Sequence, residues 1–136
     1  MQLKRDTEYA LRILMCAAKQ TQNGITALEI SRHTAVPVSI TIRLCKKLAD
    51  AKLMQAVSIS KNTTGYLLCE EALNQTLYDV ISIVEGHSEL FAVFDKTTEM
   101  FSAGLQYFED AEKKITCLLK QLTLRKLKDG FFEGER

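Results

Sequence analysis

Long apolar segments are missing from this chain of 136 residues. No apolar run approaches the roughly 20 residues that a membrane-spanning helix needs. The first residues, Met1 to Asp6, also lack the apolar core of a signal peptide. We therefore expect a cytoplasmic protein that does not associate with a membrane.

Clustered cysteines are missing as well. Cys16, Cys45, Cys69 and Cys117 are far apart, with no Cys-x-x-Cys pair and no Cys/His cluster. This pattern argues against a structural zinc site and against the disulfide framework of a small secreted protein. We predict no metal site and no cofactor.

Catalytic motifs are also absent from the sequence. The two histidines, His33 and His87, are far apart, and there is neither a nucleophile elbow nor a phosphate-binding loop. Catalysis requires titratable groups that lie close together. We therefore expect a binding protein and not an enzyme.

The net charge is only +1, but the charges are unevenly distributed. Residues 1–66 contain ten Lys/Arg and four Asp/Glu, a net charge of +6. Residues 67–112 carry −9, and residues 113–136 carry +4. A basic N-terminal part suits a polyanionic partner, which the acidic middle part would repel.

The segment from Ile30 to Tyr66 is typical of a helix–turn–helix followed by a β-hairpin. A capping box formed by Thr26 and Glu29 predicts the start of one helix, and Pro37 marks the boundary to the next. We expect helices over residues 6–19, 27–34, 37–50 and 77–85, a short strand at Ile25, and a hairpin of strands 53–59 and 66–69 around a turn at 61–65. The predicted fold class is mainly α with a small β-hairpin wing.

The helix from Pro37 to Asp50 has two distinct faces. One face is a buried stripe made of Thr41, Leu44, Cys45 and Leu48. The other face combines a hydroxyl, an apolar side chain and cations, from Ser39, Ile42, Arg43, Lys46 and Lys47. An ordinary amphipathic surface helix would share this pattern. We interpret this helix as a DNA-recognition helix because of the elements around it, namely the tight turn before it and the predicted hairpin after it.

A longer helix is predicted from Ser88 to Leu122. Its heptad-like seam includes Phe101, Leu105, Phe108, Ile115, Leu119 and Leu122. A small winged domain cannot cover that much apolar surface, which favours dimerisation over packing within one chain. The predicted organisation is a winged helix–turn–helix domain at 1–86, a dimerisation region at 87–127 and a flexible tail at 128–136.

The sequence resembles the Rrf-two family of bacterial winged-helix transcriptional regulators. The matching segments are Met1-Gln-Leu, Glu8-Tyr-Ala-Leu11, Glu29-Ile-Ser31, Val38-Ser39, Leu44-Cys-Lys-Lys-Leu48, Gly65-Tyr-Leu-Leu68, Asp79-Val-Ile, Val84-Glu-Gly86, and Leu122-Thr-Leu with Leu127. No single motif is specific, but their order and spacing together support the resemblance. It implies a homodimer that binds double-stranded DNA at a pseudo-palindromic operator, commonly as a repressor.

Two features depart from that family. Many members hold an iron–sulfur cluster through three closely spaced cysteines, but the corresponding region, His87 to Lys114, contains none. In the wing, the arginine that the family inserts into the minor groove is replaced, and Lys61 is the nearest substitute. The resemblance therefore implies neither a cluster nor the family's operator preference for this chain.

The DNA-binding hypothesis assigns separate roles to the basic and polar residues. Arg43 is the candidate for reading guanine, Ile42 for contacting a thymine methyl, and Ser39 for a phosphate or a base edge. The candidate phosphate contacts are Lys46, Lys47, Lys4 and Arg5. The candidate minor-groove contacts are Lys61, Asn62, Thr63 and Thr64.

Several alternatives exist for the signal that would control such a regulator. A thiol switch through Cys69 or Cys117 is one alternative, a small-molecule or protein effector is another, and the absence of any effector is a third. Burial of Cys16 and Cys45 favours packing for these two. A further alternative is a winged-helix module for protein–protein interaction, with Ile42 as its anchor, although the charge distribution favours DNA.

Overall fold

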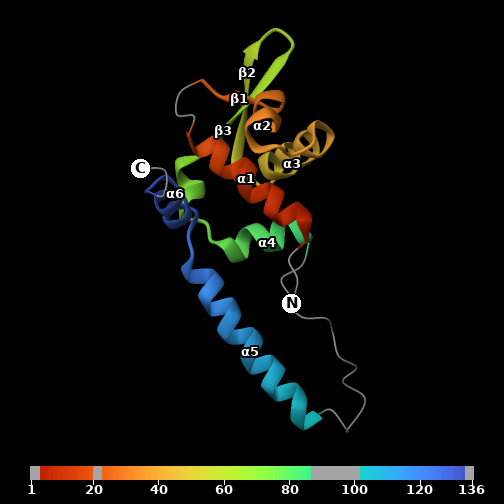
Figure 1. Ribbon diagram of the computed structural model, residues 1–136, viewed down its shortest axis with the longest axis vertical. Helices are drawn as coiled ribbons and strands as arrows, with labels where there is room; N and C mark the ends of the chain where they lie inside the picture. The colour runs from red at the N-terminus through yellow and green to blue at the C-terminus, as the bar shows by residue number, and fades with distance from the viewer. Residues whose placement is uncertain (1–3, 20–22, 87–101, 134–136) are drawn as a thin grey trace.

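The computed structural model describes residues 4–19, 23–86 and 102–133 (Figure 1). Its elements are α1 (Arg5–Lys19), β1 (Ile25–Thr26), α2 (Ala27–Thr34), α3 (Val38–Asp50), β2 (Met54–Ser60), β3 (Thr63–Leu68), the 3-10 helix η1 (Glu70–Asn74), α4 (Leu77–Glu85), α5 (Ser102–Gln121) and α6 (Leu124–Glu133). The predicted fold class, mainly α with a small β-hairpin wing, is confirmed.

Capping boxes start α2 and α4. At α2 the Glu29 amide donates to the Thr26 hydroxyl at 3.2 Å, and the Thr26 amide donates to the Glu29 carboxylate at 3.4 Å. Thr76 and Asp79 form the same reciprocal pair at the start of α4, with distances of 3.2 and 2.9 Å. Each box satisfies backbone amides that a helix start leaves without partners. The boundaries predicted for α2 and α4 are therefore confirmed.

The three strands form one antiparallel sheet in the order β1–β3–β2. Ile25 in β1 pairs with Tyr66 in β3, which confirms the short strand predicted there. The wing differs from the prediction, because Thr63 and Thr64 belong to β3 and pair with Ser60 and Ser58 of β2. The expected turn at 61–65 is thus shorter. Threonine is β-branched and fits a strand better than a turn.

Two glycines allow β1, β2 and β3 to approach each other closely. A Cβ atom at Gly65 would collide with the side chain of Ile59, and one at Gly24 would lie 2.9 Å from Cγ2 of Val57. Gly24 also has a φ of +78°, a conformation that favours glycine. The base of the wing therefore depends on backbone that carries no side chain.

Helix α1 lies at the centre of the winged domain, where it contacts α2, α3, α4 and β3. The largest buried side chains come from the four helices α1 to α4, from β1 and β2 and from α6, and they include Ile13, Leu14, Ile25, Ile30, Leu44, Leu48, Met54, Ile81 and Leu124. This single core fixes the orientation of α3 relative to the rest of the domain.

The chain returns to the winged domain after α5. The Leu77 amide donates to the Leu122 carbonyl at 2.8 Å, and the Leu124 amide donates to the Gln75 carbonyl at 2.9 Å. Leu124 is fully buried. Helix α6 continues to Glu133, so the segment from Lys128, expected as a flexible tail, is helical over most of its length.

Figure 1 shows the wing at one end of the molecule and α5 extending from the other end, beyond α4. The predicted long helix began at Ser88, whereas residues 87–101 lie outside the described part of the chain. Within the described residues, no helix is long and apolar enough to cross a membrane.

Candidate nucleic-acid interface

The turn between α2 and α3 is held by side-chain hydroxyls. Ser31 donates to the carbonyl of Val36 at 2.5 Å, and Thr41 donates to the carbonyl of Pro37 at 3.1 Å. Ala35 ends α2 in the left-handed conformation, with a φ of 61°. Because both hydroxyls are buried and satisfied, the angle between the two helices is well defined.

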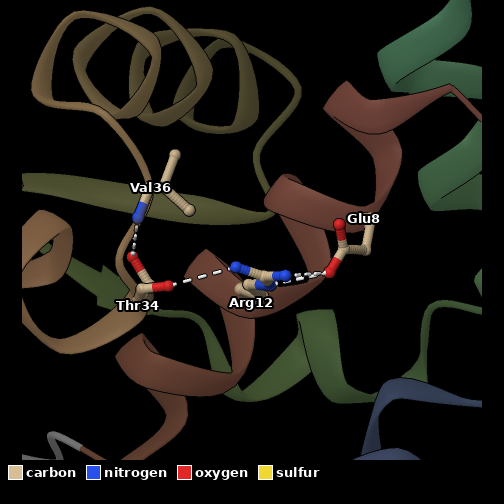
Figure 2. A network of polar contacts seen from close by, with 4 residues as sticks. All are labelled: Glu8, Arg12, Thr34 and Val36. Carbon is tan, nitrogen blue, oxygen red and sulfur yellow. Dashed lines mark hydrogen bonds and ion pairs between the residues drawn. The ribbon is translucent and has the colours of Figure 1, made fainter.

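Helix α1 supports the same turn through Arg12 (Figure 2). The Arg12 guanidinium forms an ion pair with Glu8 and donates to the carbonyl of Thr34 at 3.3 Å. The hydroxyl of Thr34 in turn accepts from the Val36 amide at 3.4 Å. A cation at the C-terminal end of α2 also opposes the negative end of its helix dipole.

The predicted two-faced character of α3 is confirmed by its burial. Its inner stripe, formed by Thr41, Leu44, Cys45 and Leu48, is completely buried. Ser39, Ile42 and Lys46 are exposed, and at about 100° per residue they share the outward face. Neither Ser39 nor Lys46 makes a side-chain hydrogen bond or ion pair with any described residue.

Arg43 and Lys47 instead point toward other parts of the protein. The Arg43 guanidinium lies 3.0 Å from the carboxylate of Asp6 in α1. The Lys47 ammonium donates to the carbonyl of Val84, in the last turn of α4, at 2.8 Å. These contacts tie α3 to its neighbours, so both cations would have to exchange a protein partner for a DNA group.

The start of α1 is connected to the end of α4. Glu85 accepts from the backbone amide of Lys4 at 3.0 Å and from the hydroxyl of Thr7 at 3.1 Å. The side chains of Lys4 and Arg5 are exposed beside this contact. Two of the predicted phosphate contacts therefore lie at a fixed helix start close to Asp6, the partner of Arg43.

The predicted wing residues fall into two groups. Lys61 and Asn62 form the tip of the hairpin, and Thr63 and Thr64 begin β3. All four side chains are exposed. Of these four residues, only Lys61 contributes charge.

The predicted dimerisation residues lie in and next to α5. Ile115 and Leu119 are half-buried, and Leu122 is exposed just beyond the helix. Phe101 lies outside the described residues, and the side chains of Leu105 and Phe108 are not described either. Beside this seam lies a second apolar stripe, in which Tyr107 is 79% exposed and Leu118 is 61% exposed.

The cysteines differ in their surroundings. Cys45 is buried, and this burial raises the pKa of its thiol to about 12, with a smaller contribution from nearby Cys16. Burial also raises the pKa of Cys16. Cys69 is half-buried and Cys117 is exposed. A raised pKa reduces the thiolate fraction on which reactivity depends, which favours packing roles for Cys16 and Cys45.

Sequence reasoning did not identify Asp6, Arg12 or Ser31 as parts of this site. Glu8 and Arg12 are four residues apart, a spacing that predicts a pair on one helix. No such signal connects Arg12 with Thr34, or Asp6 with Arg43, because these partners belong to different helices.

The fold and its exposed basic helix define a winged-helix DNA-binding protein. A family model, Rrf2, described as an iron-dependent transcriptional regulator, matches residues 3–130. The chain therefore belongs to the Rrf2 family of transcription regulators, a class of DNA-binding proteins and not of enzymes. A search of curated proteins found no match.

Solved structures support the same fold. CymR (YrzC), the global cysteine regulator of B. subtilis, has a TM-score of 0.77 and 20% identity over 95% of this chain and 97% of its own. IscR of T. potens has a TM-score of 0.76 and 19% identity over 100% of this chain and 92% of its own. The oxidised form of Staphylococcus aureus CymR has a TM-score of 0.75 and 20% identity over 94% and 96%.

The iron-dependence in the family's description is not matched by the ligands available here. The four cysteines lie on α1, on α3, directly after β3 and on α5. In the described part of the chain, no three His, Cys, Asp or Glu side chains come together as a metal site. The region from His87 to Lys114 supplies no thiolate at all. These residues do not fit a cysteine-ligated cluster of the family's usual kind.

Proposed function

We propose that the protein is a cytoplasmic, homodimeric repressor that binds a pseudo-palindromic operator without an iron–sulfur cluster. One α3 enters the major groove of each half-site, and the wing tip at Lys61 and Asn62 lies against the neighbouring backbone or minor groove. The observation that carries this proposal is the outward face of α3, where Ser39, Ile42 and Lys46 are exposed on a helix whose other face is completely buried.

Electrostatics supports DNA as the partner. The winged part up to residue 66 carries +6, and the cations of α3, of the α1 start and of the wing tip are exposed. Phosphate contacts of this kind supply most of the affinity for DNA and make it fall steeply with salt. Base edges read by α3 supply the specificity.

The proposed dimer rests on α5. Tyr107 and Leu118 expose large apolar surfaces on a helix that projects from the winged domain (Figure 1). A twofold-symmetric pairing through this stripe would bury it and would present two copies of α3 to one face of the DNA. Because a winged domain reads one half-site, the operator is expected to be an inverted repeat.

Selection of bound sequences from a random duplex pool tests the proposal. We expect an enriched inverted repeat, a dimer mass in solution, and an association constant that decreases steeply with salt concentration. In a purified transcription assay, an operator placed across the promoter should lower transcript yield. Enrichment of no sequence would contradict DNA recognition, and enrichment of a single unrepeated site would contradict the dimer.

A further inference from the structure

Two large apolar side chains are exposed side by side on α3. Val38 is 42% exposed and Ile42 is 52% exposed. They are separated by four residues, so they occupy successive turns of one helix face. Val and Ile favour a helix less than Ala or Lys does, so helix stability gives no reason for this choice at exposed positions.

Their position on α3 separates them from the residues that hold the helix in place. At about 100° per residue, Val38 and Ile42 form one edge of the outward face, Ser39 and Lys46 form its middle, and Arg43 forms the opposite edge. That opposite edge contacts α1 through the ion pair of Arg43 with Asp6. Among the described residues, the apolar edge and the middle of the face therefore stay available to a partner.

We propose that Val38 and Ile42 together read the C5-methyl groups of thymines in the major groove, an inference that rests on the proposed function. The thymine methyl is the one hydrocarbon group that the major groove offers, and it distinguishes thymine from cytosine. The two side chains are about 6 Å apart along the helix axis, close to two base-pair steps of about 3.4 Å. The pair therefore reads thymines one or two steps apart.

The surrounding charge makes DNA the occupant that fits this edge. Lys46 lies beside Ile42 on the outward face and is exposed, without a protein partner among the described residues. A protein partner would have to bury or neutralise this charge at the rim of the apolar contact. The duplex instead offers phosphates for the lysine and methyl groups for the apolar pair at the same time.

This assignment changes the expected source of specificity. Arg43, the candidate guanine reader, is engaged by Asp6, whereas Val38 and Ile42 present exposed apolar surface and form no hydrogen bond or ion pair through their side chains that DNA would have to replace. Sequence preference is then carried largely by thymine positions in each half-site, with Arg43 adding to it after it exchanges Asp6 for a base.

Uracil substitution tests the proposal, because it removes only the methyl group from a thymine. With the full-length protein and an operator obtained by selection, each half-site thymine is replaced by uracil and the affinity is measured by fluorescence anisotropy at fixed salt. We expect a loss of about fourfold for each methyl that is read. Ile42→Ala and Val38→Ala should each lower affinity for the thymine operator and abolish the effect of uracil at one position.

Leu28→Ala is the matched control, since Leu28 is 48% exposed on α2 and lies outside the apolar edge. It should keep the full sensitivity to uracil. Circular dichroism checks that each variant folds, which exposed positions should allow. Sequence-specific binding that ignores uracil, conserved half-sites without thymine, or undiminished uracil sensitivity in both α3 variants would overturn the methyl readout alone. Absence of any sequence-specific binding would overturn the proposed function together with it.

Discussion

Helices α3 and α5 are both amphipathic, but their apolar faces differ in how far the protein itself buries them. The inner stripe of α3 is completely buried against α1, α2 and α4, and its outward face mixes cations with Val38 and Ile42. None of the described side chains of α5 is fully buried, and the large apolar side chains of Tyr107 and Leu118 are 79% and 61% exposed. The C-terminal end of α5 lies against α4, where Lys120 stacks on the Tyr78 ring at 4.9 Å.

The difference indicates what each helix requires from outside its own chain. A rigid helix with a basic outward face is ready to receive a polyanion without rearranging its core. A projecting helix with an apolar stripe gains stability when a second apolar face removes that stripe from water. We interpret α3 as the DNA-reading helix and α5 as the pairing helix, and four predictions test that division.

The largest expected effect concerns the two thiols on these helices, Cys45 on the buried face of α3 and Cys117 on the exposed face of α5. At pH 8, a pKa of about 12 leaves Cys45 almost entirely protonated. Alkylation of Cys45 by iodoacetamide should be roughly a thousandfold slower than that of an ordinary free thiol. Cys117 should react readily, and peptide mass spectrometry against time measures both.

Unfolding the protein in urea should make the two thiols react at similar rates. Cys45 reacting as fast as Cys117 in the folded protein would show that α3 is not the rigid helix described here. Loss of DNA binding after modification of Cys117 alone would support the thiol-switch alternative.

Leu118→Glu should break the pairing of α5. A carboxylate at this exposed apolar position would have to be buried in the proposed dimer, so we expect a monomer by sedimentation and a loss of operator affinity of roughly a hundredfold or more. Gln106→Glu adds the same charge at an exposed position of α5 outside the apolar stripe and should remain dimeric. A dimeric Leu118→Glu protein would mean that the interface lies elsewhere.

Lys46→Ala should weaken DNA binding by removing a cation from the outward face of α3. Loss of one phosphate contact is expected to lower affinity by roughly fivefold to tenfold for all sequences alike and to reduce the salt slope by about one. Lys113→Ala removes an exposed cation from α5 and should change neither quantity. Equal effects of the two substitutions would mean that Lys46 makes no direct phosphate contact and only adds to the overall electrostatic attraction of DNA.

Asp6→Asn should have the smallest effect of the four changes, and it should raise the affinity for DNA instead of lowering it. It removes the ion pair that engages Arg43, an exposed contact worth about 0.2–1 kcal/mol, so operator affinity should rise by a factor of roughly 1.4 to 5. Glu8→Gln makes the same change in charge on α1 but affects Arg12, and it should not raise affinity. In the Arg43→Ala background the gain from Asp6→Asn should disappear, and base preference should relax.

Local patterns were sufficient for much of the fold. The capping boxes at Thr26 and Thr76, the left-handed Gly86 and the buried stripe from Thr41 to Leu48 each depend on residues within one turn or two. The prediction for the wing is less accurate. The pairing of Thr63 and Thr64 with β2 depends on the register between the strands and not on the composition of the turn. The sequence does not predict the helix beyond Lys128. Helix α6 is held by Leu124, which is buried in the core of the winged domain, and this domain is far from α6 in sequence.

The sequence by itself therefore determined the helices α1 to α4, the presence of the wing, the two faces of α3, the uneven charge and the departure from a cysteine-ligated cluster, since all of these follow from residue type and spacing. Only the tertiary structure decided which cations on α3 already have partners. Arg43 meets Asp6, and Lys47 meets the end of α4, through contacts between helices that are separate in sequence. Such contacts arise when one buried core fixes the relative positions of several helices, and among the described residues the same core leaves the apolar edge at Val38 and Ile42 exposed.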